Sequence, residues 1–127
     1  MKVAIIIVRL LMGLMFLFAS IVVLFNLMPH PEMKGNAKLF MDGLMATGYF
    51  MTLLKLTELV CGLAFVTGRF VPLATVVIFP ITLNILFYHA FVAPEGLPVA
   101  IPLMLGNLFL AYACRNHYKT LLASKIA

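Results

Sequence analysis

Four long apolar stretches dominate this sequence, at about residues 3–27, 49–67, 72–92 and 97–114. Each is close to the ~20 apolar residues that a helix needs to cross the hydrocarbon core of a bilayer. Because lipid offers no partners to backbone N–H and C=O groups, such stretches cross a membrane as helices. The sequence therefore predicts an all-α membrane protein, a bundle of four transmembrane helices that forms a single domain over residues 1–127.

The composition excludes a soluble globular protein. Hydrophobic residues make up 65% of the chain and charged residues 10%, against about 45–50% and about 25% in soluble domains. A chain this short lacks the polar residues that would cover its apolar side chains in water. The first stretch is followed by Pro29 without a small-residue cleavage site. We therefore expect it to remain as a spanning helix and not to be removed as a signal peptide.

The net charge of +5 does not indicate a nucleic-acid-binding protein. The nine lysine and arginine residues are scattered along the chain, nearly all in or beside the gaps between apolar stretches. They form no basic stripe, and cations at such positions contact lipid headgroups. Cys61 and Cys114 belong to no C-x-x-C pair. The pattern therefore predicts membrane lipid as a partner, no nucleic acid, no metal site and no vicinal dithiol.

The segment between the first two spans, residues 29–48, contains prolines, glycines and charged side chains typical of a loop outside the hydrocarbon. Within it, Leu39, Phe40, Leu44 and Met45 recur at helical spacing. The segment is consistent with a short helix lying in the membrane interface, or with a loop that caps the bundle. Both alternatives stay open.

The distribution of cations predicts the orientation of the spans. With the amino terminus inside, five cations face the cytoplasm and two face outward. The inner five are Lys2, Arg69, Arg115, Lys119 and Lys125, and the outer two are Lys34 and Lys38. Since the cytoplasmic side carries the excess of Lys and Arg, we expect both termini to be cytoplasmic.

Three ionisable residues stand inside the spans, Arg9 in the first and Lys55 and Glu58 in the second. Each costs about 2.5–3.5 kcal/mol at the centre of a lone inserting helix, so we expect all three to face the bundle interior. Lys55 and Glu58 are three residues apart and project from one helix face, about 60° apart. If the first two spans pack together, Arg9 can also pair with Glu58. Such a pocket holds two cations and one anion and suits a carbonyl-bearing or anionic group.

The later spans add three neutral polar candidates, Asn84, His89 and Asn107. Asn84 and His89 lie about 140° apart around their helix, so both reach one cavity only if Pro80 bends that helix or one of them faces a neighbour. Together with Arg9, Lys55 and Glu58 they form the predicted ligand-binding set.

Buried polar side chains also hold helices together without binding anything. For Asn26, Asn84 and Asn107 taken singly we favour this role, whereas intramembrane charges favour a functional pocket. His89 is equally consistent with an interfacial residue that bonds to water or to a loop carbonyl.

The ordered polar positions resemble those of the DoxX family of small four-helix bacterial membrane proteins. The resemblance rests on Arg9 with Gly13 and Phe16, and on the blocks Glu58–Gly62, Thr67–Ala74, Asn84–His89 and Gly96–Pro98. It implies a bundle in the bacterial cytoplasmic membrane and an association with quinone-linked redox or thiol and oxidative-stress systems.

From the residues and the resemblance together, we expect an accessory subunit without a covalently bound cofactor. It would bind a lipophilic ligand such as a quinone in a midplane polar pocket, beside a redox-enzyme partner or a second copy of itself. Two alternatives stay open: a membrane enzyme that uses Glu58 as an acid or base, and a transporter of lipids or small solutes. The lack of inverted repeats in four helices disfavours the transporter.

Overall fold

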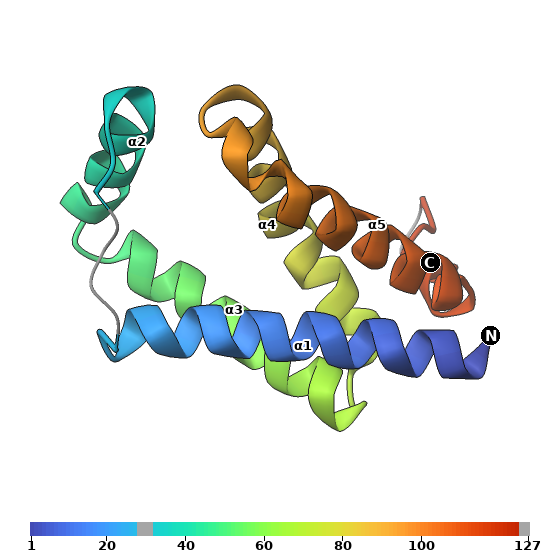
Figure 1. Ribbon diagram of the computed structural model, residues 1–127. Coiled ribbons are helices and arrows are strands. Elements are labelled where there is room, and N and C mark those ends of the chain that lie inside the picture. Colours follow the sequence, from blue (N-terminus) through green and yellow to red (C-terminus); the bar gives the residue numbers. More distant parts are fainter. Residues whose placement is uncertain (28–31, 125–127) are drawn as a thin grey trace.

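The computed structural model describes residues 1–27 and 32–124, and every regular element in these two ranges is a helix (Figure 1). The elements in chain order are α1 (Lys2–Leu24), α2 (Gly35–Ala46), α3 (Phe50–Thr67), α4 (Val71–Phe91), the 3-10 turn η1 (Pro94–Gly96), α5 (Leu97–Ala113) and the 3-10 turn η2 (Arg115–Tyr118). Helices α1, α3 and α4 and the segment Pro94–Ala113 are long and apolar enough to cross a membrane. The predicted all-α fold with four spans is confirmed.

The helix boundaries lie close to the predicted ones and have local causes. Helix α1 ends at Leu24, three residues before the predicted end of the first span, and Asn26 follows with a positive φ of 52°. Helix α3 ends where Gly68 adopts the left-handed conformation, with φ 75°, which glycine tolerates without steric cost. Helix α4 begins with Pro72 in its first turn and continues through Pro80.

The segment between the first two spans contains a helix. Helix α2 covers Gly35–Ala46, so the alternative of an unstructured capping loop is wrong for these residues. None of its residues is buried, as expected of a short helix that lies outside the bundle core. Pro29, with the rest of residues 28–31, lies outside the described part of the chain.

Helices α1 and α3 pack in antiparallel directions with their backbones in contact. A methyl group added at Gly13 would lie 3.0 Å from the Gly62 carbonyl oxygen, and one added at Gly62 would lie 3.1 Å from the Gly13 carbonyl oxygen. Small residues allow this close approach, and in lipid, where no hydrophobic effect drives helices together, close packing stabilises their association. This contact sets the register between the two helices.

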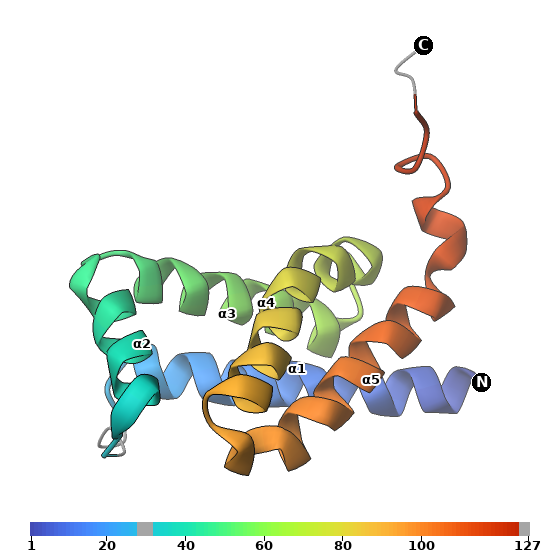
Figure 2. The ribbon, with the colours of Figure 1, turned by 90° about the horizontal axis from the view of Figure 1, so that it is seen from above.

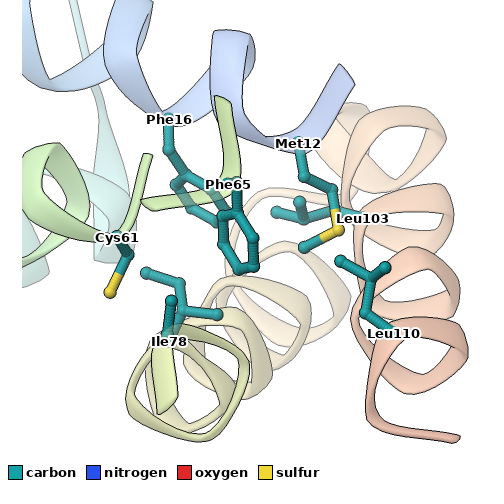
Figure 3. Packing of buried hydrophobic residues seen from close by; sticks show 8 residues of the cluster. Met12, Phe16, Cys61, Phe65, Ile78, Leu103 and Leu110 are labelled. Atoms are coloured by element: carbon teal, nitrogen blue, oxygen red, sulfur yellow. The ribbon is translucent and has the colours of Figure 1, made fainter. Parts of the chain in front are cut away.

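A small apolar core joins the four long helices (Figure 3). It is formed by buried side chains of α1, α3, α4 and α5, including Met12, Phe16, Phe65, Ile78, Leu103 and Leu110. Helix α5 packs against both α4 and α1. Most other large apolar side chains are exposed on the outside, where lipid would contact them.

Helix α2 stands apart from this core, at the end of the molecule far from the amino terminus (Figures 1 and 2). It follows α1 and leads directly into α3, against which it packs. Phe40 of α2 also reaches Tyr88 of α4, with ring centroids 5.1 Å apart. Helix α2 therefore contacts both α3 and α4 at that end of the molecule.

Candidate functional site

A wide cleft with a volume of about 1530 Å³ lies between α2, α3 and α4. Its lining is mostly apolar, and three of the predicted site residues, Lys55, Asn84 and His89, contribute polar atoms from α3 and α4. Ligand sites typically combine an apolar wall with a few polar groups. The apolar side chains of the lining include Phe40, Met41, Leu44, Met51, Leu54, Ile81, Ile85 and Tyr88.

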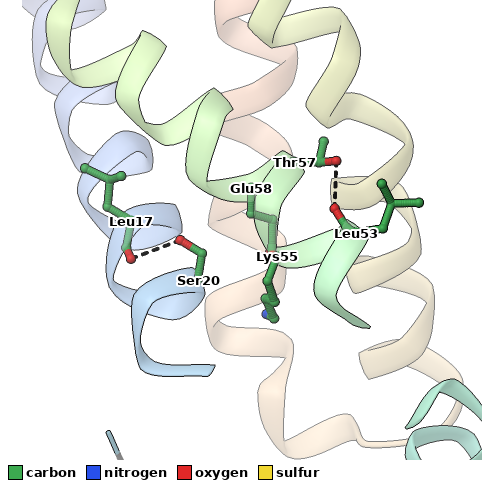
Figure 4. A network of polar contacts seen from close by, with 6 residues as sticks. All are labelled: Leu17, Ser20, Leu53, Lys55, Thr57 and Glu58. Carbon is green, nitrogen blue, oxygen red and sulfur yellow. Dashed lines mark hydrogen bonds and ion pairs between the residues drawn. The ribbon is translucent and has the colours of Figure 1, made fainter. Parts of the chain in front are cut away.

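Lys55 and Glu58 form the ion pair that their spacing predicts, and Figure 4 shows both residues on α3. Nζ of Lys55 lies 3.0 Å from Oε2 of Glu58, and the two side chains are 16% and 4% exposed. The Oε2 atom is buried without a partner at hydrogen-bonding geometry, so the contact is an electrostatic one. Lys55 lines the cleft, whereas Glu58 is absent from the cleft lining and is buried. The carboxylate thus compensates the charge of an ammonium group that is available to a ligand.

Asn84 and His89 both reach the cleft from α4. Asn84 is exposed there, so it does not hold two helices together as we favoured for a lone asparagine. His89 is half-buried, and its Nδ1 lies 3.1 Å from the carbonyl oxygen of Ala93. The bond to a loop carbonyl, one of the two roles considered for His89, is therefore present. His89 also remains on the cleft wall.

Arg9 lies away from the cleft, at the opposite end of α3. Its guanidinium group contacts Gly68, ten residues and therefore roughly 15 Å along the helix from Glu58. The register set by Gly13 and Gly62 carries Arg9 past the last turn of α3, so the hypothetical pair with Glu58 does not form. A cation at this place is favoured by the unpaired carbonyls and negative dipole end of the helix.

Asn107 is fully buried between α4 and α5 and takes no part in the cleft. Its Nδ2 donates to the carbonyl oxygen of Thr75 at 3.4 Å, while its Oδ1 is buried without a partner. This bond joins two helices and corresponds to the structural role considered for it. The structure thus brings together Lys55, Glu58, Asn84 and His89, and leaves Arg9 and Asn107 elsewhere.

Helix α2 contributes a second ion pair to the cleft lining, which the sequence reasoning did not single out. Lys38 and Asp42 line the cleft and form an ion pair, with Nζ and Oδ2 2.8 Å apart. The hydrogen bond to Asp42 and the attraction of its charge raise the pKa of Lys38 above its ordinary value. The spacing of four residues was a readable signal for this pair. No local signal could show that Phe40 would contact α4.

The part of the chain that the structure describes contains no group of three His, Cys, Asp or Glu side chains able to hold a metal ion. On α3 and α4 the cleft instead presents the ammonium group of Lys55, the amide of Asn84 and the imidazole of His89, and the charged side chains of Lys38 and Asp42 line it from α2. The ammonium, amide and imidazole groups can donate hydrogen bonds to oxygen atoms of an organic ligand.

Comparison with protein families identifies a family to which the sequence is similar. The sequence model of the DoxX family matches residues 4–90, a range that includes Lys55, Glu58, Asn84 and His89 and ends before Asn107. No curated protein and no solved structure matches the chain.

Proposed function

The chain belongs to the DoxX family and is a multi-pass membrane protein, and from this premise we propose that it is an accessory subunit that binds a lipophilic ligand. The ligand carries oxygen acceptors on a flat or apolar body, as a quinone does. It occupies the cleft between α2, α3 and α4, while a partner redox enzyme of a quinone-linked or thiol and oxidative-stress system performs the chemistry.

The observation that carries this proposal is the position of Lys55. Its ammonium group has three donors and lies on a mostly apolar cleft wall. Its Nζ atom is 3.0 Å from Oε2 of Glu58, a buried carboxylate that does not line the cleft. The ion pair reduces the cost of keeping the cation in a membrane span. A donor fixed in this way forms a charge-assisted hydrogen bond to a ligand oxygen, about twice as strong as a neutral one.

The position of Glu58 disfavours a membrane enzyme. Its side chain is 4% exposed and lies behind Lys55, so a reactant in the cleft would meet the ammonium group first. A general acid or base must come within hydrogen-bonding reach of the proton that it transfers. Binding therefore agrees better with the geometry than acid–base catalysis by Glu58.

The proposal includes the bacterial cytoplasmic membrane, with both termini in the cytoplasm. Four candidate spans support this orientation, because an even number of crossings returns a chain to the side on which it starts. The excess of Lys and Arg near the two ends supports the cytoplasmic side. A reporter fused after Lys125, a residue outside the described ranges, is expected to act as cytoplasmic, and one inserted near Gly35 as periplasmic. A periplasmic signal from the carboxyl-terminal fusion would contradict this orientation.

The ligand is tested by removing both charges of the buried pair together. The double variant Lys55→Met and Glu58→Gln keeps the shape of both side chains and leaves no unpaired charge in the interior, so its fold should persist. The matched control, Lys38→Met with Asp42→Asn, removes the exposed pair on the other wall of the same cleft.

The readout is the affinity of each protein in nanodiscs for a benzoquinone with one isoprene unit, measured by thermal shift. The parent and the control are expected to bind it equally. The buried double variant should bind about 10- to 100-fold more weakly, since a hydrogen bond to a charged group contributes about 1.5–3 kcal/mol. If the benzoquinone does not stabilise the parent, or if the buried double variant keeps its full affinity, the proposed function is wrong.

A further inference from the structure

The imidazole of His89 lines the cleft, and one of its two nitrogens is engaged in the fold. Nδ1 lies 3.1 Å from the carbonyl oxygen of Ala93. A carbonyl oxygen only accepts hydrogen bonds, so Nδ1 carries the hydrogen and donates. In a neutral imidazole this leaves Nε2 with its lone pair as an acceptor. Within the described ranges Nε2 has no hydrogen-bond partner.

The surroundings of His89 hold the ring in this orientation. The backbone of Gly96 lies against the edge that carries Nδ1, and a methyl group at Gly96 would collide with the ring. The ring of Tyr88 meets the imidazole edge-on, with centroids 5.0 Å apart, and Phe40 of α2 contacts Tyr88. Exchanging the two nitrogens would break the bond to Ala93. The edge that remains for the cleft is therefore the acceptor edge.

The two cleft walls thus offer opposite hydrogen-bonding groups. Lys55 on α3 can only donate, whereas Nε2 of His89 on α4 accepts. A ligand with oxygen acceptors alone satisfies Lys55 and places an oxygen lone pair against that of Nε2. A ligand that also carries a hydroxyl group satisfies both walls.

We propose that His89 makes the cleft selective for a headgroup that bears a hydroxyl donor beside its oxygen acceptor. This inference rests on the proposed function and deepens it. For a quinone ligand, the reduced dihydroxy form binds more tightly than the oxidised dicarbonyl form. One net hydrogen bond of ordinary strength corresponds to about a tenfold difference in Kd.

This selectivity would change the redox behaviour of the bound ligand. A tenfold preference for the reduced form raises the potential of a two-electron couple by about 30 mV relative to the free couple. Reduction of the ligand by a partner enzyme is thereby favoured in the cleft.

A hydroxyl donor beside an acceptor also occurs in phosphatidylglycerol, whose glycerol headgroup follows a phosphate. The same selectivity for a phospholipid predicts that phosphatidylglycerol binds more tightly than phosphatidylmethanol, which has the same phosphate charge without hydroxyl groups. A quinone ligand and a phospholipid ligand are therefore distinguished by measuring the oxidised and reduced quinone as one pair of probes and the two phospholipids as the other.

The experiment compares His89→Asn with the parent in nanodiscs. The amide nitrogen of asparagine takes the place of Nδ1 and keeps the donor to Ala93, while the acceptor at Nε2 is lost. The control is His117→Asn, which changes an exposed histidine in η2. The probes are the one-isoprene benzoquinone and the same molecule reduced with anaerobic dithionite, with dithionite alone as a blank, and the two phospholipids.

The parent and His117→Asn are expected to bind the reduced quinone about tenfold more tightly than the oxidised form, and His89→Asn should bind both equally. If both forms bind the parent equally, or if His89→Asn keeps the preference, the inference is wrong while the proposed function stands. If neither quinone form binds but the parent prefers phosphatidylglycerol through His89, hydroxyl selectivity stands and the proposed quinone ligand is wrong. If the parent binds none of the four probes, both the inference about His89 and the proposed function are wrong.

A second variant covers the case in which His89→Asn fails to fold. Gly96 has φ −91°, so alanine fits its backbone, but the added methyl group must displace the imidazole. Gly96→Ala is therefore expected to remove the preference for the reduced form. An unchanged preference in this variant contradicts the assignment to His89.

Discussion

Two lysine–carboxylate pairs each contribute a lysine to the lining of the same cleft, and they differ chiefly in burial. Lys38 and Asp42 on α2 are 2.8 Å apart with side chains 61% and 62% exposed, and Lys55 and Glu58 on α3 are 3.0 Å apart with side chains 16% and 4% exposed. The distances are nearly equal. In the exposed pair each partner has water as an alternative, so the pair contributes little. In the buried pair the Glu58 carboxylate has no other partner, so losing Lys55 leaves an uncompensated charge in the interior.

The difference also separates two functional roles. An exposed lysine is free to leave its carboxylate, and its contact does not fix where the ammonium group points. The buried pair holds one donor at a constant place on the cleft wall, which lowers the ordering cost of binding. This comparison predicts that changes to the buried pair alter stability and ligand binding, whereas changes to the exposed pair alter neither.

The largest expected effect comes from Lys55→Met alone. It leaves the Glu58 carboxyl group buried without its cation, and the free energy of unfolding should fall by about 3–5 kcal/mol. The matched variant Lys38→Met leaves Asp42 in water and should unfold like the parent. Thermal unfolding in one detergent measures both, and equal midpoints for the two variants would show that burial does not distinguish the pairs.

Glu58→Gln should have a smaller effect. The unpaired ammonium group of Lys55 lines the cleft and can move toward water with its flexible stem, so we expect a loss on the order of 2 kcal/mol. The control Glu95→Gln changes an exposed carboxylate in η1. The same thermal unfolding measurement checks whether Glu58→Gln loses less stability than Lys55→Met and more than Glu95→Gln. A Glu58→Gln variant as stable as Glu95→Gln would remove the case for a buried charge pair.

The smallest effect concerns the titration of Lys38. Its pKa is raised because it donates to Asp42 and is attracted to that charge. A raised pKa in the folded state means that the contribution of the pair is present below the ordinary lysine pKa and is lost as the pH rises through the raised value. Asp42→Asn should return the pKa toward the ordinary value, as followed by NMR of labelled lysine side chains. An identical titration in the variant would contradict the pairing.

Features that depend on one helix could be predicted from the sequence. The four spans follow from the length of apolar stretches, and the pair of Lys55 with Glu58 follows from the helical repeat, because both are local properties. The helical spacing of Leu39, Phe40, Leu44 and Met45 was consistent with a helix within the segment that contains α2, but it left a capping loop open as an equal alternative.

Features that depend on two or more helices were decided only by the tertiary structure. The contact of Gly13 with Gly62 sets the sliding register of α1 on α3, and this register separates Arg9 from Glu58. The rotation of each helix about its axis decides that Asn107 is buried while Asn84 faces the cleft. A helical repeat specifies which residues share a face, but the packing of the other helices specifies what that face meets. The charged pair was therefore determined by the sequence itself, and the cleft beside it by the placement of α2 and α4.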